Sequence, residues 1–210
     1  MIKKGCYLKY LIIYFLFLLD FILKMKNEKI EIQNTKNEIV GIFDENDNYV
    51  GKDTRKNMRK NNLIHRCTDI VVVNQKNELL VQTRSMQKEY CPGYLDAVVG
   101  GVVGDGEEPD LCAEREVNEE IGIDIHKIKE KLKFINKYFF EEDICRVWTY
   151  CYLLKLSDDE IKYINFSDHE VSSIQWIPKD KLLNILDDKK YKFTGGSKQT
   201  IKHFFKQKLI

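Results

Sequence analysis

The sequence lacks the marks of a nucleic-acid-binding, zinc-binding or disulfide-linked protein. Its 34 basic and 33 acidic residues leave a formal net charge of +1, so no overall field attracts nucleic acid or an anionic membrane surface. Its six cysteines form no C-x-x-C pair and no zinc-ligand spacing. Several of them stand in apolar stretches, as reduced core cysteines do, and a chain of this length does not need a disulfide framework. We therefore expect a reducing compartment, the cytoplasm.

The sequence also lacks an apolar run long enough to span a membrane, although residues 1–24 approach one. Lys9 and Asp20 interrupt the apolar residues there, whereas a spanning helix needs about 20 of them. The chain has two alanines, neither in this segment, so no small-residue cleavage site follows. Three interpretations stay open: an uncleaved targeting or anchor segment, a poor signal peptide, or a non-native extension before a true start at Met25. Organelle targeting and membrane contact are expected only if this extension is retained.

Residues 37–210 have the pattern of one α+β domain. Hydrophobic residues make up 43% and charged residues 32% of the chain, the balance of a soluble globular protein. A hairpin is predicted at 38–51. The short basic helix after it is predicted to expose Lys56, Arg59 and Lys60 to solvent. Further strands are predicted at 67–74, 79–85, 94–101, 131–140, 145–156 and 170–178. Helices are predicted at 109–121, 179–188 and 196–209. This order favours a mixed β-sheet sandwiched between α-helices.

The predicted helix 109–121 carries three glutamates on one side. Glu116, Glu119 and Glu120 are three and four residues apart, and like charges at this spacing repel by a few tenths of a kcal/mol per pair. The opposite side has a buried stripe at four-residue spacing, formed by Ala113, Val117 and Ile121. Oxygen ligands grouped in this way suit a hard divalent cation, Mg²⁺ or alternatively Mn²⁺.

The loop before this helix supplies the rest of the expected site. Gly100 and Gly101 stand where a strand runs into the loop, and glycines there let the backbone turn sharply and aim a carbonyl at a metal. Glu107 and Arg115 are predicted to form an ion pair that ties the loop to the helix.

These residues resemble the signature of the Nudix hydrolase family. The pattern is Gly, five residues, Glu, seven residues, Arg-Glu, an aliphatic residue, any residue, Glu-Glu, any residue, Gly and an aliphatic residue. All nine positions are matched within 23 residues, by Gly101, Glu107, Arg115, Glu116, Val117, Glu119, Glu120, Gly122 and Ile123. The resemblance implies the Nudix fold, with its core at about residues 65–200, and cleavage of a phosphoanhydride bond in a nucleoside diphosphate linked to another group.

The resemblance also implies roles for these residues. Glu116, Glu119 and Glu120 would be metal ligands, and Gly101 would offer its carbonyl oxygen to the metal. Glu116 is the first candidate for the general base. Glu119 and Arg115 complete the expected catalytic group, Arg115 as the structural partner of the loop glutamate. The implied mechanism is attack of a metal-activated water on phosphorus.

Residues 37–200 are similar to the Nudix branch that contains isopentenyl-diphosphate isomerase. In that enzyme the positions of Arg84 and Lys88 contact the substrate diphosphate, which suits a guanidinium fork and an ammonium point charge. The isomerase itself is disfavoured, because its catalytic cysteine falls at Val99 and a metal-binding histidine at Gly101. The carboxylates and histidine that resemble other isomerase positions are interpreted as relics or auxiliary contacts: Glu141, Asp143 and His65.

We therefore expect a pyrophosphohydrolase that acts on a small-molecule diphosphate. Glu170 is an auxiliary candidate, on the loop where many Nudix enzymes place an extra carboxylate. A non-catalytic diphosphate-binding module is the alternative from another class, and it is disfavoured because every glutamate of the signature is present. An RNA-cap hydrolase would want a basic channel, which the charge balance does not indicate. No nucleic-acid partner is expected, and a homodimer stays open.

Overall fold

The computed structural model describes residues 14–23, 26, 37–166 and 170–209. The chain divides into two compact units, Met1–Glu38 and Ile39–Ile210. In the first unit, residues 14–23 form a helix with exposed side chains. Among the described residues, no helix is both long enough and apolar enough to cross a membrane. Most of the expected extension 1–24 lies outside the described residues, so its assignment stays a prediction.

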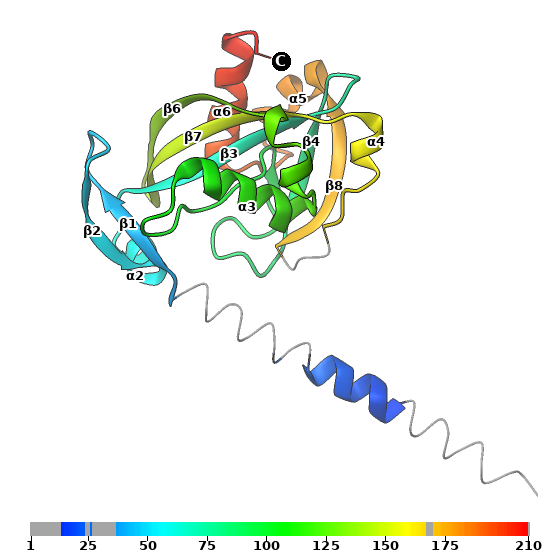
Figure 1. The fold of residues 1–210 in the computed structure, drawn as a ribbon, viewed down its shortest axis with the longest axis horizontal. Helices are drawn as coiled ribbons and strands as arrows, with labels where there is room; N and C mark the ends of the chain where they lie inside the picture. Colours follow the sequence, from blue (N-terminus) through cyan, green and yellow to red (C-terminus); the bar gives the residue numbers. More distant parts are fainter. Residues whose placement is uncertain (1–13, 24–25, 27–36, 167–169, 210) are drawn as a thin grey trace, which may run out of the picture. The chain divides into compact units, whose positions relative to one another are not determined.

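The second unit is built on a mixed sheet of six strands (Figure 1). The strands are β3 (His65–Val73), β4 (Glu78–Arg84), β5 (Leu95–Asp96), β6 (Leu132–Glu142), β7 (Cys145–Lys155) and β8 (Val171–Pro178). Their order is β5-β4-β3-β7-β6, and β8 pairs with β4. The β3–β7 pair is parallel, and the other pairs are antiparallel. The predicted class, α+β with a mixed sheet, is confirmed.

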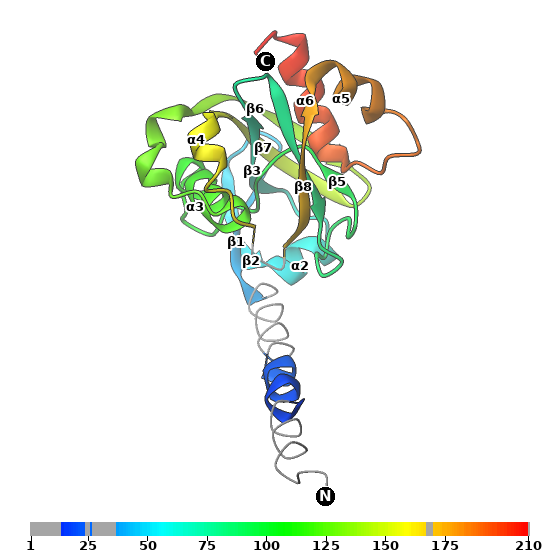
Figure 2. The same ribbon diagram turned by 90° about the vertical axis from the view of Figure 1, so that its right-hand side faces the viewer.

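Helices cover both faces of this sheet. Figure 2 shows α3 (Pro109–Ile121) on one side, and α5 (Lys179–Leu186) and α6 (Gly195–Lys206) on the other. The apolar run at the end of β3 explains the two layers, because successive strand residues point to opposite faces. Ile70 and Val72 pack in the cluster with α3, whereas Val71 and Val73 pack in the cluster with α5 and α6.

A hairpin and a short helix precede the sheet. The hairpin joins β1 (Ile39–Phe43) to β2 (Tyr49–Thr54), and α2 (Arg55–Lys60) follows directly. The Thr54 side chain accepts a hydrogen bond from the Asn57 N–H and caps α2. Met58 is buried with Val40 and Val102. The prediction that Lys56, Arg59 and Lys60 are exposed to solvent is wrong for Arg59, whose side chain is partly buried.

Two parts of the unit differ from the prediction. The expected strand 94–101 is a ladder only at Leu95–Asp96. Beyond it, single bridges link Val99 to Ile70 and Val102 to Cys67, because the glycines between them turn the chain. The expected elements also do not include three short helices: η1 (Ile125–Lys127), η2 (Lys129–Lys131) and α4 (Asp158–Ile161).

Candidate active site

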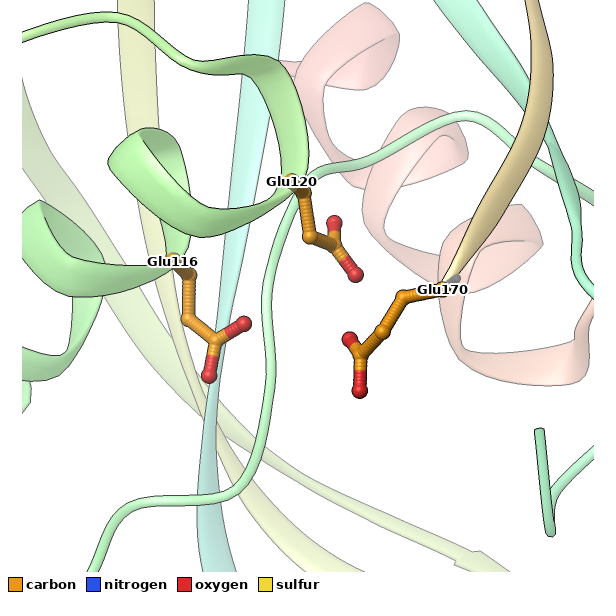
Figure 3. Close-up of side chains that lie close together, drawn as sticks. All are labelled: Glu116, Glu120 and Glu170. Atoms are coloured by element: carbon orange, nitrogen blue, oxygen red, sulfur yellow. The ribbon is translucent and has the colours of Figure 1, made fainter. Parts of the chain in front are cut away.

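Two buried glutamates of α3 and one glutamate before β8 converge. Glu116 and Glu120 lie about one turn apart on α3, and Glu170 directly precedes β8. A carboxylate oxygen of each lies within 4.8 Å of the corresponding oxygens of the other two, and Figure 3 shows the three side chains directed toward one another. Three carboxylates at this separation suit a hard divalent cation. We call these residues the carboxylate cluster.

The two ends of α3 hold its glutamates in place. Pro109 stands in the first turn, where its missing N–H removes no helical hydrogen bond. Gly122 ends the helix with a φ of 67°, and a Cβ there would lie 2.4 Å from the carbonyl oxygen of Asn165. A glycine is therefore needed at this helix end. The stripe packed against the sheet is the predicted one: Ala113, Val117 and Ile121.

Arg115 links the loop to the helix and to the carboxylate cluster. Its Nε and Nη2 donate to the two oxygens of Glu107 at 3.0 and 3.2 Å, which confirms the predicted ion pair. Glu107 also accepts from the Gly104 N–H at 2.8 Å, so the pair fixes the loop. Arg115 Nη1 donates to Glu116 at 2.7 Å and to Glu119 at 2.9 Å. Burial lowers the pKa of Arg115, but these carboxylates raise it by more.

Glu119 is placed apart from the carboxylate cluster. Its side chain is 46% exposed, and it pairs with Arg115 one helical turn earlier. The third carboxylate beside Glu116 and Glu120 is instead Glu170, which the sequence predicts only as an auxiliary group. A metal-ligand role for Glu119 stays a prediction.

Glu120 is fully buried, and two neutral donors hold its Oε2. Gln82 Nε2 donates to its Oε2 at 2.9 Å and to the Val98 carbonyl at 2.9 Å. The Gly100 N–H donates to the same Oε2 at 3.1 Å. These bonds fix the direction of the carboxylate, as outer-shell partners commonly do in metal sites.

Burial sets the electrostatics of the two α3 carboxylates. Burial, followed by the charge of Glu120, raises the pKa of Glu116 to about 8. Burial also raises the pKa of Glu120, against the opposing effects of Lys88 and Gln82. Desolvation disfavours both charged forms. A divalent cation between these groups would restore the charged state of both.

Lys88 bridges two members of the carboxylate cluster. It stands in the loop between β4 and β5, and its Nζ lies 3.3 Å from Glu120 Oε1 and also donates to Glu170. Burial lowers the pKa of Lys88, but the two glutamates raise it overall. Burial pushes the pKa of Glu170 upward, and the charge and hydrogen bond of Lys88 bring it below the ordinary value.

Arg84 lies at the end of β4 beside this loop. Its Nη1 pairs with Asp96 at 2.9 Å, and its Nε donates to the Tyr90 carbonyl at 3.0 Å. Its side chain is only 11% exposed. The expected contact of Arg84 and Lys88 with a substrate diphosphate stays a prediction.

Two polar residues of this site are not among the predicted site residues. Gln82 interrupts an apolar stretch of β4, and Asp96 stands between apolar residues in β5. Both are buried. A polar side chain at an inward strand position must find a hydrogen-bond partner, and this signal could have found them.

Gly101 lies directly against the carboxylate cluster. A Cβ on Gly101 would fall 2.2 Å from Glu116 Oε1. The Gly101 carbonyl accepts from the Thr68 N–H at 2.9 Å, and the Cys112 thiol donates to the same oxygen at 3.9 Å. Its expected contact with a metal stays a prediction. At Gly100 a Cβ would lie 1.9 Å from the Thr68 carbonyl oxygen, so the strand crossing there needs a glycine.

The residues interpreted as isomerase relics are not part of the carboxylate cluster. His65 is buried, its Nδ1 lies 3.1 Å from the Leu63 carbonyl oxygen, and burial lowers its pKa to about 3. The Glu141 side chain is 57% exposed and pairs with Arg146. The backbone carbonyl of Asp143 accepts a hydrogen bond from Asn62.

The fold and the site define an α+β domain with a carboxylate-lined centre between a helix and a mixed sheet. Residues 63–202 match the NUDIX domain. The chain belongs to the Nudix family.

The relatives are Nudix hydrolases from bacteria. An uncharacterized Nudix hydrolase of Yersinia pestis is 42% identical over 111 residues, which cover 53% of this chain and 59% of the relative. One of Pseudomonas aeruginosa is 33% identical over 141 residues, which cover 64% of this chain and 81% of the relative. The chain thus spans less than two thirds of the first relative's length.

Solved structures share the fold. A crystal structure from Deinococcus radiodurans has a TM-score of 0.64 at 21% identity and covers 79% of this chain and 98% of its own. A MutT protein from Methanosarcina mazei has a TM-score of 0.56 at 20% identity and covers 69% of this chain and 95% of its own.

Proposed function

We propose that the protein is a divalent-metal-dependent pyrophosphohydrolase. It would cleave a phosphoanhydride bond in a nucleoside diphosphate-linked compound or another organic diphosphate. The single observation that carries this proposal is the convergence of Glu116, Glu120 and Glu170 within 4.8 Å. The family adds support, because the relatives are named Nudix hydrolases.

The residues present fit a hard divalent cation. Glu116, Glu120 and Glu170 offer oxygen ligands only, and two of them are buried with raised pKa values. These three carboxylates would hold Mg²⁺ or Mn²⁺, with Gly101 offering its carbonyl oxygen. When bound, such a cation supplies neutralisation of phosphate charge and a lower pKa for a water.

The protein groups would divide the remaining work. Glu116 is the candidate general base, because its carboxylate is directed into the carboxylate cluster. Arg115 acts as a positioning residue that holds Glu116 through the hydrogen bond at 2.7 Å. Lys88 and Arg84 would attract the substrate diphosphate, Lys88 as a point charge and Arg84 as a fork.

Two alternatives are weaker. A non-catalytic binding module does not need three convergent carboxylates with this burial. An isomerase needs a proton donor where the cysteine of that enzyme stands, and here Val99 is fully buried in the apolar cluster with α3. At the histidine position, Gly101 offers no side chain.

The test is a turnover screen of the full chain with Mg²⁺ or Mn²⁺. The compounds are nucleoside triphosphates, dinucleotides, nucleotide sugars, coenzymes, capped RNA and isopentenyl diphosphate. We expect metal-dependent hydrolysis of at least one compound, and a loss of about 100-fold or more in Glu120→Gln. The matched control is Glu108→Gln, an exposed glutamate directly before α3, and it should keep the wild-type rate. Binding without turnover on every compound would favour the module instead.

A further inference from the structure

Arg59 is a partly buried cation that has no carboxylate partner among the described residues. It lies on α2, at the end of the domain where Figure 2 also shows the start of β8. Its Nε is buried and has no hydrogen-bond partner within the described part of the chain. Its neighbours on the same helix, Lys56 and Lys60, are exposed. The helix thus turns one of its three predicted surface charges inward.

Among the described groups that act most strongly on Arg59, none is a carboxylate. Burial lowers its pKa, and the groups that act most strongly on it are Arg55, Cys145, Cys67 and Tyr90. By contrast, Arg84, whose side chain is 11% exposed, has Asp96 at 2.9 Å. A buried charge without a partner of opposite charge is strongly destabilising. An anion bound beside such a group would supply the missing opposite charge.

Tyr90 connects Arg59 to the active site. The Arg59 guanidinium carbon lies 5.3 Å from the centre of the Tyr90 ring, and that of Arg84 lies 5.9 Å from the same centre. The charge of Arg55, the first residue of α2, also acts on Glu170 of the carboxylate cluster. The cations therefore continue from the carboxylate cluster past Lys88 and Arg84 to Arg59.

We propose that Arg59 binds a second anionic group of the substrate, a phosphate monoester outside the diphosphate that is cleaved. That this anion belongs to a substrate rests on the proposed function. The site itself rests on the Arg59 guanidinium beside Tyr90 and on its buried Nε, which has no hydrogen-bond partner among the described residues. Arg84 and Lys88 would serve the scissile diphosphate, and Arg59 would select compounds that carry an additional phosphate.

The first experiment measures anion binding without turnover. Inorganic phosphate is titrated into the metal-free full chain by calorimetry, for the wild type, Arg59→Met and Lys60→Met. A charge-assisted hydrogen bond contributes enough to predict at least about tenfold weaker binding in Arg59→Met. Lys60→Met should bind as the wild type does. Equal binding by Arg59→Met, or no binding by the wild type, would overturn the proposal.

Thermal unfolding of the same variants separates a binding role from a structural one. Removing a buried charge that has no carboxylate partner should leave the Tm of ligand-free Arg59→Met unchanged or higher. A clearly lower Tm would assign Arg59 to the fold and overturn the binding role.

Paired substrates then test selectivity. NADPH and NADH differ by one phosphate monoester, as do coenzyme A and dephospho-coenzyme A. For a pair that is hydrolysed, the wild type should prefer the phosphorylated member by about tenfold or more in kcat/KM, and Arg59→Met should bring the ratio close to one. A preference that survives in Arg59→Met argues against the site. Loss of phosphate binding in Arg59→Met with no turnover by the wild type on any compound would instead reject the hydrolase and keep the anion site.

Discussion

A side chain on Gly101 would occupy the place of the Glu116 carboxylate: an added Cβ would lie 2.2 Å from Glu116 Oε1. Glu116 cannot retreat freely, because it is buried and its carboxylate is bonded to Arg115. The position of the Glu116 carboxylate therefore requires a glycine at residue 101. This contact explains why a glycine at this position accompanies this arrangement of glutamates.

The first prediction concerns Gly101→Ala. The methyl group should displace Glu116 and lower both the metal affinity and kcat/KM by about 10–100-fold, the usual effect of disturbing a metal ligand's surroundings. Metal affinity is measured by calorimetry and activity on the best compound of the screen. Gly196→Ala is the control, because a Cβ added there would meet nothing within 4 Å. Equal metal affinity in Gly101→Ala and the wild type would contradict the steric argument.

The second prediction concerns Gln82, a positioning residue for Glu120. Gln82→Leu removes the 2.9 Å hydrogen bond to Glu120 and should weaken metal binding about tenfold or more. Gln82→Asn should recover little, because its shorter amide reaches less far. The control is Gln87→Leu, the same substitution at an exposed glutamine. If Gln82→Leu changes only the Tm and not the metal affinity, the residue is merely structural.

The third prediction concerns the fork of Arg115. Lysine cannot bond both oxygens of Glu107 and also the carboxylate of Glu116. Arg115→Lys should therefore lower the free energy of unfolding by ~2 kcal/mol. It should also reduce kcat more than it changes KM, because Glu116 loses its orientation. Arg146→Lys is the control, because its partners Glu45 and Glu141 are 66% and 57% exposed. Its effect should stay below about 1 kcal/mol. Equal effects of the two variants would refute the special role of Arg115.

The fold could be predicted from local patterns wherever periodicity and caps agree. Helix 109–121 has a proline at its start, a glycine at its end and a buried stripe, and its predicted bounds are those observed. The segment 94–101 has strand composition, but its ladder ends after Asp96. The pairing of Val99 and Val102 with β3 depends on backbone turns at glycines. The amino-acid composition of the segment does not predict these turns.

The site could be predicted only in its local part. The spacing of Glu116 and Glu120 indicates their proximity, because residues four apart lie on the same face of an α-helix. Glu170 reaches them through the pairing of β8 with β4, a contact across the sheet that spacing does not encode. For the same reason, the sequence predicts Arg59 as a surface charge, since only the folded chain brings the loop that carries Tyr90 against α2.

The last prediction follows from the pKa of Glu116. An unfolded glutamate loses its proton near pH 4.5, whereas the folded, metal-free Glu116 loses it at a pKa of about 8. Between these values the folded state binds more protons than the unfolded state, so its stability decreases as the pH rises. The raised pKa of Glu120 acts in the same direction. His65, whose pKa falls to about 3, has the opposite effect, but only below its unfolded value of 6.5.

In the interval from about pH 6.5 to pH 8 the contribution of His65 is absent. Asp69, whose pKa burial raises to about 7, acts in the same direction as the α3 carboxylates in the lower part of this interval. In EDTA the Tm should decrease across this interval, and the slope should be smaller in Glu116→Gln, because glutamine does not titrate. Added Mg²⁺ should raise the Tm more at the upper end, since the metal displaces the proton that Glu116 otherwise holds. Glu108→Gln should keep the wild-type slope. A Tm that rises with pH in EDTA, or a slope that Glu116→Gln leaves intact, would show that the α3 carboxylates are charged without a metal.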